Sequence, residues 1–97
     1  MAKSLVERRL IELGDRLKTL RVDLRVADEQ LAQLAEEAEE SRLRSLVSET
    51  PLAERDYREA QRHADAMQRH RLEVSAEITH LERAQDELLD RLMLEHE

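Results

Sequence analysis

Apolar residues recur with heptad spacing along two long stretches of this sequence, and its single proline, Pro51, separates the stretches. Within each stretch, mostly apolar residues follow one another at alternating intervals of three and four. This spacing aligns them along one side of an α-helix, and it indicates a coiled coil when it lasts for many heptads. We call the two rows seams. The first consists of Val6, Leu10, Leu13, Leu17, Leu20, Leu24, Ala27, Leu31, Leu34, Ala38, Ser41 and Ser45, and the second of Ala53, Tyr57, Ala60, Ala64, Met67, Arg71, Val74, Ile78, Leu81, Gln85, Leu88 and Leu92.

The segment Ser48-Glu49-Thr50-Pro51 is the strongest break in the helical pattern. Thr is a good N-cap, and Pro suits the first position of a helix while disfavouring helical geometry in the residue before it. We therefore expect one helix over residues 3–48, a turn at 48–51 and a second helix over 51–96, in a single hairpin domain spanning 1–97. Gly14 could interrupt the first helix, but the seam keeps its phase there and glycine costs only about 1 kcal/mol.

A single antiparallel register matches the two seams along their whole length. It predicts an all-α fold, an antiparallel two-helix coiled-coil hairpin. Charges agree on the whole, since residues 1–25 carry seven basic and four acidic side chains and residues 76–97 carry two basic and seven acidic. The predicted layers are Val6 with Leu92, Leu10 with Leu88, Leu13 with Gln85, Leu17 with Leu81, Leu20 with Ile78, Leu24 with Val74, Ala27 with Arg71, Leu31 with Met67, Leu34 with Ala64, Ala38 with Ala60, and Ser41 with Tyr57.

Single charge pairs test this register in more detail. Arg21 with Glu82 and Arg44 with Asp56 bring opposite charges together, whereas Arg9 with Arg91 brings like charges together. Exposed pairs contribute only about 0–1 kcal/mol each, so the burial of leucine decides the fold.

Composition excludes most catalytic and ligand-binding chemistry. With no Cys, the chain has no thiol nucleophile, thiolate metal site or disulfide, which fits a reducing, cytoplasmic compartment. One glycine cannot form a phosphate-binding loop. A net charge of −7 and a single aromatic residue argue against direct binding of nucleic acid. No apolar run is long enough to cross a membrane. We therefore expect no enzyme, no cofactor, no metal site and no membrane contact.

Apolar residues off the seams gather at the open end of the hairpin, where the chain begins and ends. A two-helix hairpin cannot bury a stripe this wide on both helices. We expect this group to mediate self-association, giving a dimer that forms a four-helix assembly; a different partner protein or simple exposure are the alternatives. The group consists of Leu5, Ile11, Leu89, Met93 and Leu94.

A second off-seam group surrounds the turn. One hypothesis is that it closes the turn as a plug, with Leu46 against Leu52. The other is that it forms an apolar contact patch for an unidentified protein, with an acidic rim. The apolar members are Leu43, Leu46, Val47 and Leu52, and the acids are Glu49, Glu54 and Asp56.

Other polar features have simpler interpretations. Helix two carries His63, His70 and His80, with His96 at its end, and a solvated face explains them better than a metal site, because two histidines seven residues apart on one helix cannot bind the same ion. The acidic run over residues 36–40 is a solvated face or a docking patch for a basic partner. Arg71 can extend from the seam to water.

These features predict a non-enzymatic interaction protein, an oligomerising adaptor or scaffold. The alternative is a regulator that inserts its tip into a larger machine. In outline the hairpin resembles the coiled-coil arm of the Gre and DksA transcription factors, and the segment Leu52-Ala53-Glu54-Arg55-Asp56-Tyr57 is loosely similar to the Gre tip. The resemblance covers the hairpin only. It implies a tip that enters the secondary channel of RNA polymerase, with Glu49, Glu54 and Asp56 as its acids.

Overall fold

The computed structural model describes residues 4–96, which form two long helices. Helix α1 spans Leu5–Ser48 and α2 spans Pro51–Glu95, and the two pack against each other in antiparallel orientation. The predicted antiparallel hairpin is thus confirmed. Helix α1 runs through Gly14 without a break, and α2 ends one residue before the predicted position. The predicted start of helix one at residue 3 lies outside the described residues.

Side chains cap both helices at their N-termini. The hydroxyl of Ser4 accepts a hydrogen bond from the Glu7 backbone N–H at 3.1 Å, and the hydroxyl of Thr50 accepts one from the Ala53 N–H at 3.2 Å. Each cap satisfies a backbone donor that has no partner within its helix. The cap at Thr50 confirms the turn that the sequence predicts. Between the helices, Glu49 has a φ of 49°, in the left-handed region where glycine is usual after a helix.

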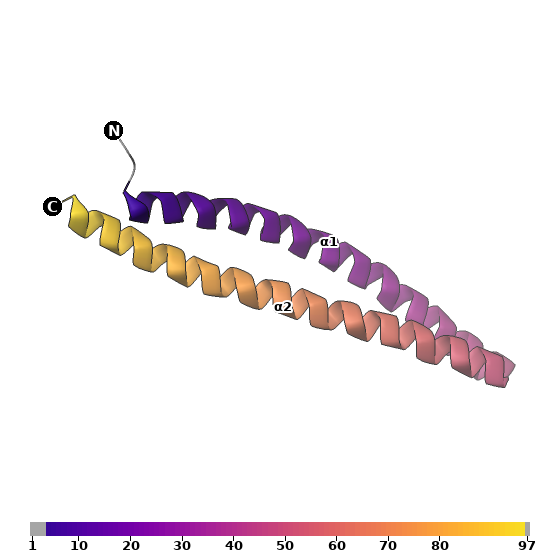
Figure 1. Ribbon diagram of the computed structural model, residues 1–97. Helices are drawn as coiled ribbons and strands as arrows, with labels where there is room; N and C mark the ends of the chain where they lie inside the picture. The colour runs from indigo at the N-terminus through magenta and orange to yellow at the C-terminus, as the bar shows by residue number, and fades with distance from the viewer. Residues whose placement is uncertain (1–3, 97) are drawn as a thin grey trace. The chain divides into compact units, whose positions relative to one another are not determined.

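The packing divides into two units, each built from both helices. The open-end unit contains residues up to Leu24 and from Val74 onward, and the turn unit contains Arg25–Glu73. In the open-end unit, the first half of α1 lies beside the second half of α2; in the turn unit, the remaining halves lie side by side and are joined by the turn (Figure 1). Each predicted layer falls within one of these units, so each unit tests the register independently.

Leucine, valine and isoleucine form the core of the open-end unit. Leu17 and Leu20 of α1 pack with Val74 and Ile78 of α2, and the first two are 1% and 2% exposed. Leu24 and Leu81 extend this cluster, as the predicted register requires. Burying an aliphatic side chain of this size contributes about 1.5–3 kcal/mol.

Small residues dominate the seam of the turn unit. Its buried side chains are alanines, which bury less apolar area than leucine, while Leu31, Leu34 and Met67 are half-buried. Arg71 extends from the seam beside the buried Ala27 and forms an ion pair with Asp28. The turn unit therefore obtains less of its stability from apolar burial. The buried alanines are Ala27, Ala38, Ala53 and Ala64.

Two ion pairs between arginine and glutamate cross between the helices of the open-end unit at exposed positions. Arg21 Nη2 lies 3.4 Å from Glu82 Oε2, which confirms that predicted pair, and Arg16 Nη2 lies 3.1 Å from Glu77 Oε1. Arg44 and Asp56 are not among the ion pairs of residues 4–96, so that expectation is wrong. Because half-exposed pairs of this kind contribute about 0–1 kcal/mol, the seam determines stability.

Gln85 provides a test of the seam, because it is a half-buried amide in the layer assigned to Leu13. We expect Gln85→Leu to raise the free energy of unfolding by about 1 kcal/mol, since an apolar side chain replaces a polar one at the interface of the helices. Chemical denaturation followed by circular dichroism measures this. The control is Gln33→Leu, the same change at an exposed position, which should change stability by less than about 0.5 kcal/mol. Equal effects of the two substitutions would contradict the assigned seam.

Candidate functional site

Large apolar side chains of the open-end unit remain exposed after the helices pack. All five residues that the sequence assigns to self-association are 44–69% exposed. By contrast, every position of the two predicted seams is buried or half-buried. The hairpin thus covers its seam and leaves these five side chains on its surface.

The five residues divide between two sides of the open-end unit. The sides follow from heptad spacing, because residues seven apart lie on the same face of a coiled-coil helix. Leu5 lies one heptad before Glu12 on α1, and Leu94 lies one heptad after Glu87 on α2. Both glutamates line a groove on one side of the unit, so the two leucines lie on that side. Ile11, Leu89 and Met93 occupy the rows of the opposite side. The sequence predicts the exposed residues but groups them as one patch.

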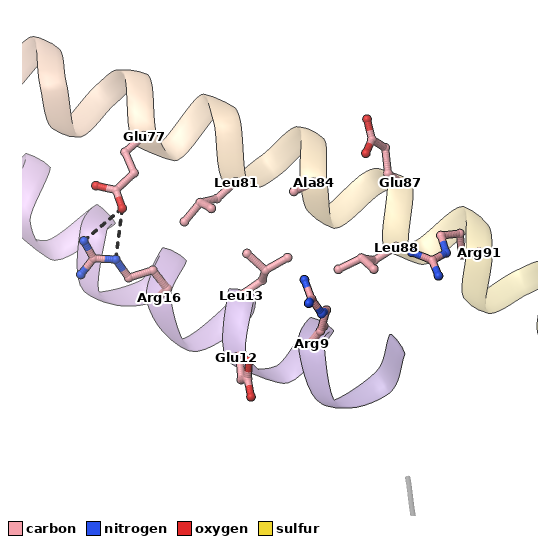
Figure 2. A pocket seen from close by; sticks show the side chains of 10 residues that line it. All are labelled: Arg9, Glu12, Leu13, Arg16, Glu77, Leu81, Ala84, Glu87, Leu88 and Arg91. Carbon is pink, nitrogen blue, oxygen red and sulfur yellow. Dashed lines mark hydrogen bonds and ion pairs between the residues drawn. The ribbon is translucent and has the colours of Figure 1, made fainter. Parts of the chain in front are cut away.

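The groove on the first side has a volume of about 560 Å³ and an apolar floor. Figure 2 shows Leu13 of α1 directed toward Leu81 and Leu88 of α2, while the carboxylates of Glu12 and Glu87 point away from the space between the helices. The half-buried Ala84 also lines the floor. This arrangement offers apolar area to a partner helix but no enclosed cavity for a small molecule.

Arginines line both edges of this groove. Arg16 donates two hydrogen bonds to Glu77 Oε1, at 3.3 Å from Nε and 3.1 Å from Nη2 (Figure 2). Arg9 and Arg91, which the sequence register places together as like charges, line the same groove from α1 and α2. The groove therefore combines an apolar floor with edges that carry both charges, because Glu12, Glu77 and Glu87 line it together with the three arginines.

Around the turn, the apolar residues are exposed rather than packed. Leu46 and Leu52 are 60% and 66% exposed, so the plug expected between them is wrong. Each of the two residues lies one position away from a seam residue, and one position along an α-helix rotates a side chain by about 100° around the helix axis. The two side chains therefore point away from the interface of the helices. Leu43 and Val47 are exposed as well.

The acids assigned to the tip lie on the same part of the turn unit. Glu49, Glu54 and Asp56 are all exposed, and Glu49 is the residue with a positive φ. A left-handed conformation costs a residue with a side chain about 1–2 kcal/mol. The tip thus presents acidic and apolar side chains together on a turn that glycine would form at lower cost.

The glutamates of the acidic run lie on an exposed helix face, as both of its interpretations, a solvated face and a docking patch, require. Ala38 of this run is buried on the seam, whereas the four glutamates at 36, 37, 39 and 40 are exposed. Glu39 accepts a hydrogen bond from Arg42 Nη2 at 2.7 Å, and this bond lowers the pKa of the Glu39 carboxyl below its ordinary value. The same bond raises the pKa of Arg42.

The histidines of α2, and His96 directly after it, do not gather into a site. His63, His70, His80 and His96 are all exposed. Across residues 4–96 there is no group of three or more His, Asp or Glu side chains placed to hold a metal ion. His96 Nε2 lies 3.8 Å from a Glu7 carboxylate oxygen and links the ends of the two helices.

Comparison with protein-family models, curated proteins and solved structures finds no match to this chain. In the part of the chain that the structure describes, neither helix has the length and apolar character needed to cross a membrane. The candidate sites therefore rest on the exposed side chains of each unit.

The pair of Glu39 and Arg42 gives a titration test. We expect Arg42→Gln to return the pKa of Glu39 upward toward its ordinary value of 4.5, because the charged hydrogen-bond donor is removed. The lowered pKa in the folded state means that the pair stabilises the fold above the unfolded pKa, and this contribution is lost as the pH falls through the folded pKa. Carboxyl ¹³C NMR titration measures the change, and Arg62→Gln, at another exposed position, should leave Glu39 unchanged.

Proposed function

We propose that this chain is a non-enzymatic interaction protein that associates with a second copy through its open-end unit, as an adaptor or scaffold. Two hairpins together form a four-helix assembly, in which helices bury apolar area that a two-helix seam leaves exposed. The tip then remains available for a different partner protein.

The observation that carries this proposal is the exposure of large apolar side chains in the open-end unit. Met93 and Leu94 are 67% and 69% exposed on consecutive positions of α2, and Leu5 is 62% exposed on α1. Exposed apolar side chains that adjoin one another mark interaction surfaces, as Ile11, Leu89 and Met93 do on one side of this unit. Scattered apolar residues such as Val22 of the same unit are ordinary, but these three lie together on one side.

The absence of a catalytic role is also part of the proposal. Catalytic side chains are commonly held in a cleft that removes them from water and shifts their pKa. Among residues 4–96 no charged or polar side chain is buried, and the charged residues that line the groove of the open-end unit are exposed or half-buried. The surface favours contact with another protein over chemistry on a small substrate.

Self-association predicts a mass of about twice 11.4 kDa by light scattering coupled to size-exclusion chromatography. We expect Leu89→Glu with Met93→Glu to give a monomer, because two charges on the apolar surface must lose their water when a second copy binds. The helical content should not change, since both positions are exposed in the hairpin.

The matched control places the same two charges on exposed apolar positions of the turn unit, Val26→Glu with Leu72→Glu. This variant should keep the mass of the wild type. A wild-type chain that is monomeric at about 100 μM would overturn the proposal.

A second candidate function is a regulator that inserts its tip into a larger machine such as RNA polymerase. Exposure of the tip supports it, because Val47 is 86% exposed and more than half of Leu46 and of Leu52 is exposed as well. The exposed acids of the tip suit a basic surface on the partner.

This second candidate predicts that the purified chain binds purified RNA polymerase. Glu49→Ala with Glu54→Ala should weaken that binding by about tenfold or more, because two acidic contacts are lost. The control, Glu36→Ala with Glu37→Ala, removes the same charge from an exposed face away from the turn. Absence of binding by the wild type in a labelled-protein titration would exclude this candidate.

A further inference from the structure

Packing within the open-end unit does not explain why residue 14 is a glycine. Gly14 lies in the interior of α1, where glycine is about 1 kcal/mol less favourable than alanine. A Cβ atom built on Gly14 would meet none of the surrounding atoms within 4 Å. Packing between the two helices therefore does not demand glycine here, and the missing side chain leaves a notch on the surface of the open-end unit.

The ion pairs of the open-end unit place Leu89 across the hairpin from this notch. Glu7 lies next to His96, and Arg21 pairs with Glu82, so both contacts follow the same register. Gly14 lies one heptad after Glu7 and one before Arg21, and Leu89 lies one heptad before His96 and one after Glu82. The layer between the two charged contacts thus consists of Gly14 and Leu89.

Exposed apolar residues adjoin this layer on both helices. Ile11 precedes Gly14 by three residues and is 46% exposed, and Met93 follows Leu89 by four and is 67% exposed. Residues three or four apart are neighbours on a helix surface. Two apolar side chains and a notch therefore lie next to Leu89, on the side of the unit opposite the groove.

The charged residues at the edge of this surface favour a second copy of the chain as the molecule that binds there. Lys18 follows Gly14 by four residues and Asp86 precedes Leu89 by three, and both are exposed. When two copies meet on this side, α1 of one can lie on α1 or on α2 of the other. The second arrangement brings the basic segment 1–25 against the acidic segment 76–97, whereas the first opposes like charges.

We propose that two copies pack through this surface, with α1 of each copy on α2 of the other, so that Leu89 of each copy enters the notch at Gly14 of the other. The contact is isologous, as a two-fold dimer requires. In the same register, Ile11 packs beside Met93 and Lys18 faces Asp86. This inference rests on the proposed self-association and specifies its surface. The surface, called the Gly14 face, consists of Ile11, Gly14, Lys18, Asp86, Leu89 and Met93.

The first experiment fills the notch with Gly14→Leu. Leucine has a much higher helix propensity than glycine, so the hairpin itself should unfold at a higher temperature in dilute solution. The dimer dissociation constant, measured by sedimentation equilibrium, should nevertheless rise at least about tenfold, because the new side chain occupies the place of Leu89. The control, Ala76→Leu, places the same side chain at an exposed position of α2 and should leave the dissociation constant unchanged.

The second experiment exchanges the edge charges. Lys18→Glu and Asp86→Lys should each weaken the dimer by about tenfold, because each opposes like charges at two symmetric contacts. An equal mixture of the two variants should restore dimers with the affinity of the wild type, since every contact in the mixed dimer joins opposite charges. A purely intramolecular effect of either substitution cannot be rescued by mixing.

The outcomes separate this inference from the proposed function. A wild-type monomer overturns both. If the wild type is a dimer that Gly14→Leu leaves intact and mixing does not rescue the charge variants, the Gly14 face is wrong and self-association stands through another surface, such as the groove. Loss of the dimer in Gly14→Leu together with rescue on mixing supports the face and its orientation.

Discussion

Burial of an apolar seam between only two helices is the interaction on which this structure depends. Each helix can cover the other on one side alone, so the buried side chains are confined to seam positions such as Leu17, Leu20 and Ile78. A residue one position away is turned by about 100° toward solvent. Consequently, an apolar residue off the seam can be buried only by another molecule. In a thicker bundle the same residue would be hidden within the fold and would carry no information about partners.

The sequence was sufficient to predict the seam and the turn, because both depend on local rules. Heptad spacing identifies which residues face the other helix, and Thr50 followed by Pro51 marks where a new helix begins. The same rules could have excluded the plug between Leu46 and Leu52. The heptad phase is kept as far as Ser45 and resumes at Ala53, so neither leucine faces the other helix unless the adjoining turn of helix unwinds. That unwinding would break backbone hydrogen bonds and lose the cap on Ala53.

The division of the open-end residues over two sides was harder to predict. The sequence identifies the apolar residues that lie off the seams, but the side of the unit on which each one lies depends on the register of one helix against the other. The pairs of Arg21 with Glu82 and Arg16 with Glu77 establish the two opposite sides. Once these are known, the heptad positions place Leu89 on one side and Leu94 on the other. Leu89 is thereby identified as the residue across from the notch at Gly14, which sequence periodicity alone does not show.

Charge has a different role from apolar burial in this chain. Charged residues make up 40% of the sequence, yet the cross-helix pairs of the open-end unit are about half exposed and contribute little to folding. A charge pattern that the hairpin does not need for stability can instead discriminate between ways of packing helices, because opposing like charges penalises the wrong arrangement. A basic first segment and an acidic last segment favour their own antiparallel contact within one hairpin. The same asymmetry applies to any second pair of helices placed beside them, so the rule that orients the fold also sets the orientation of the proposed dimer.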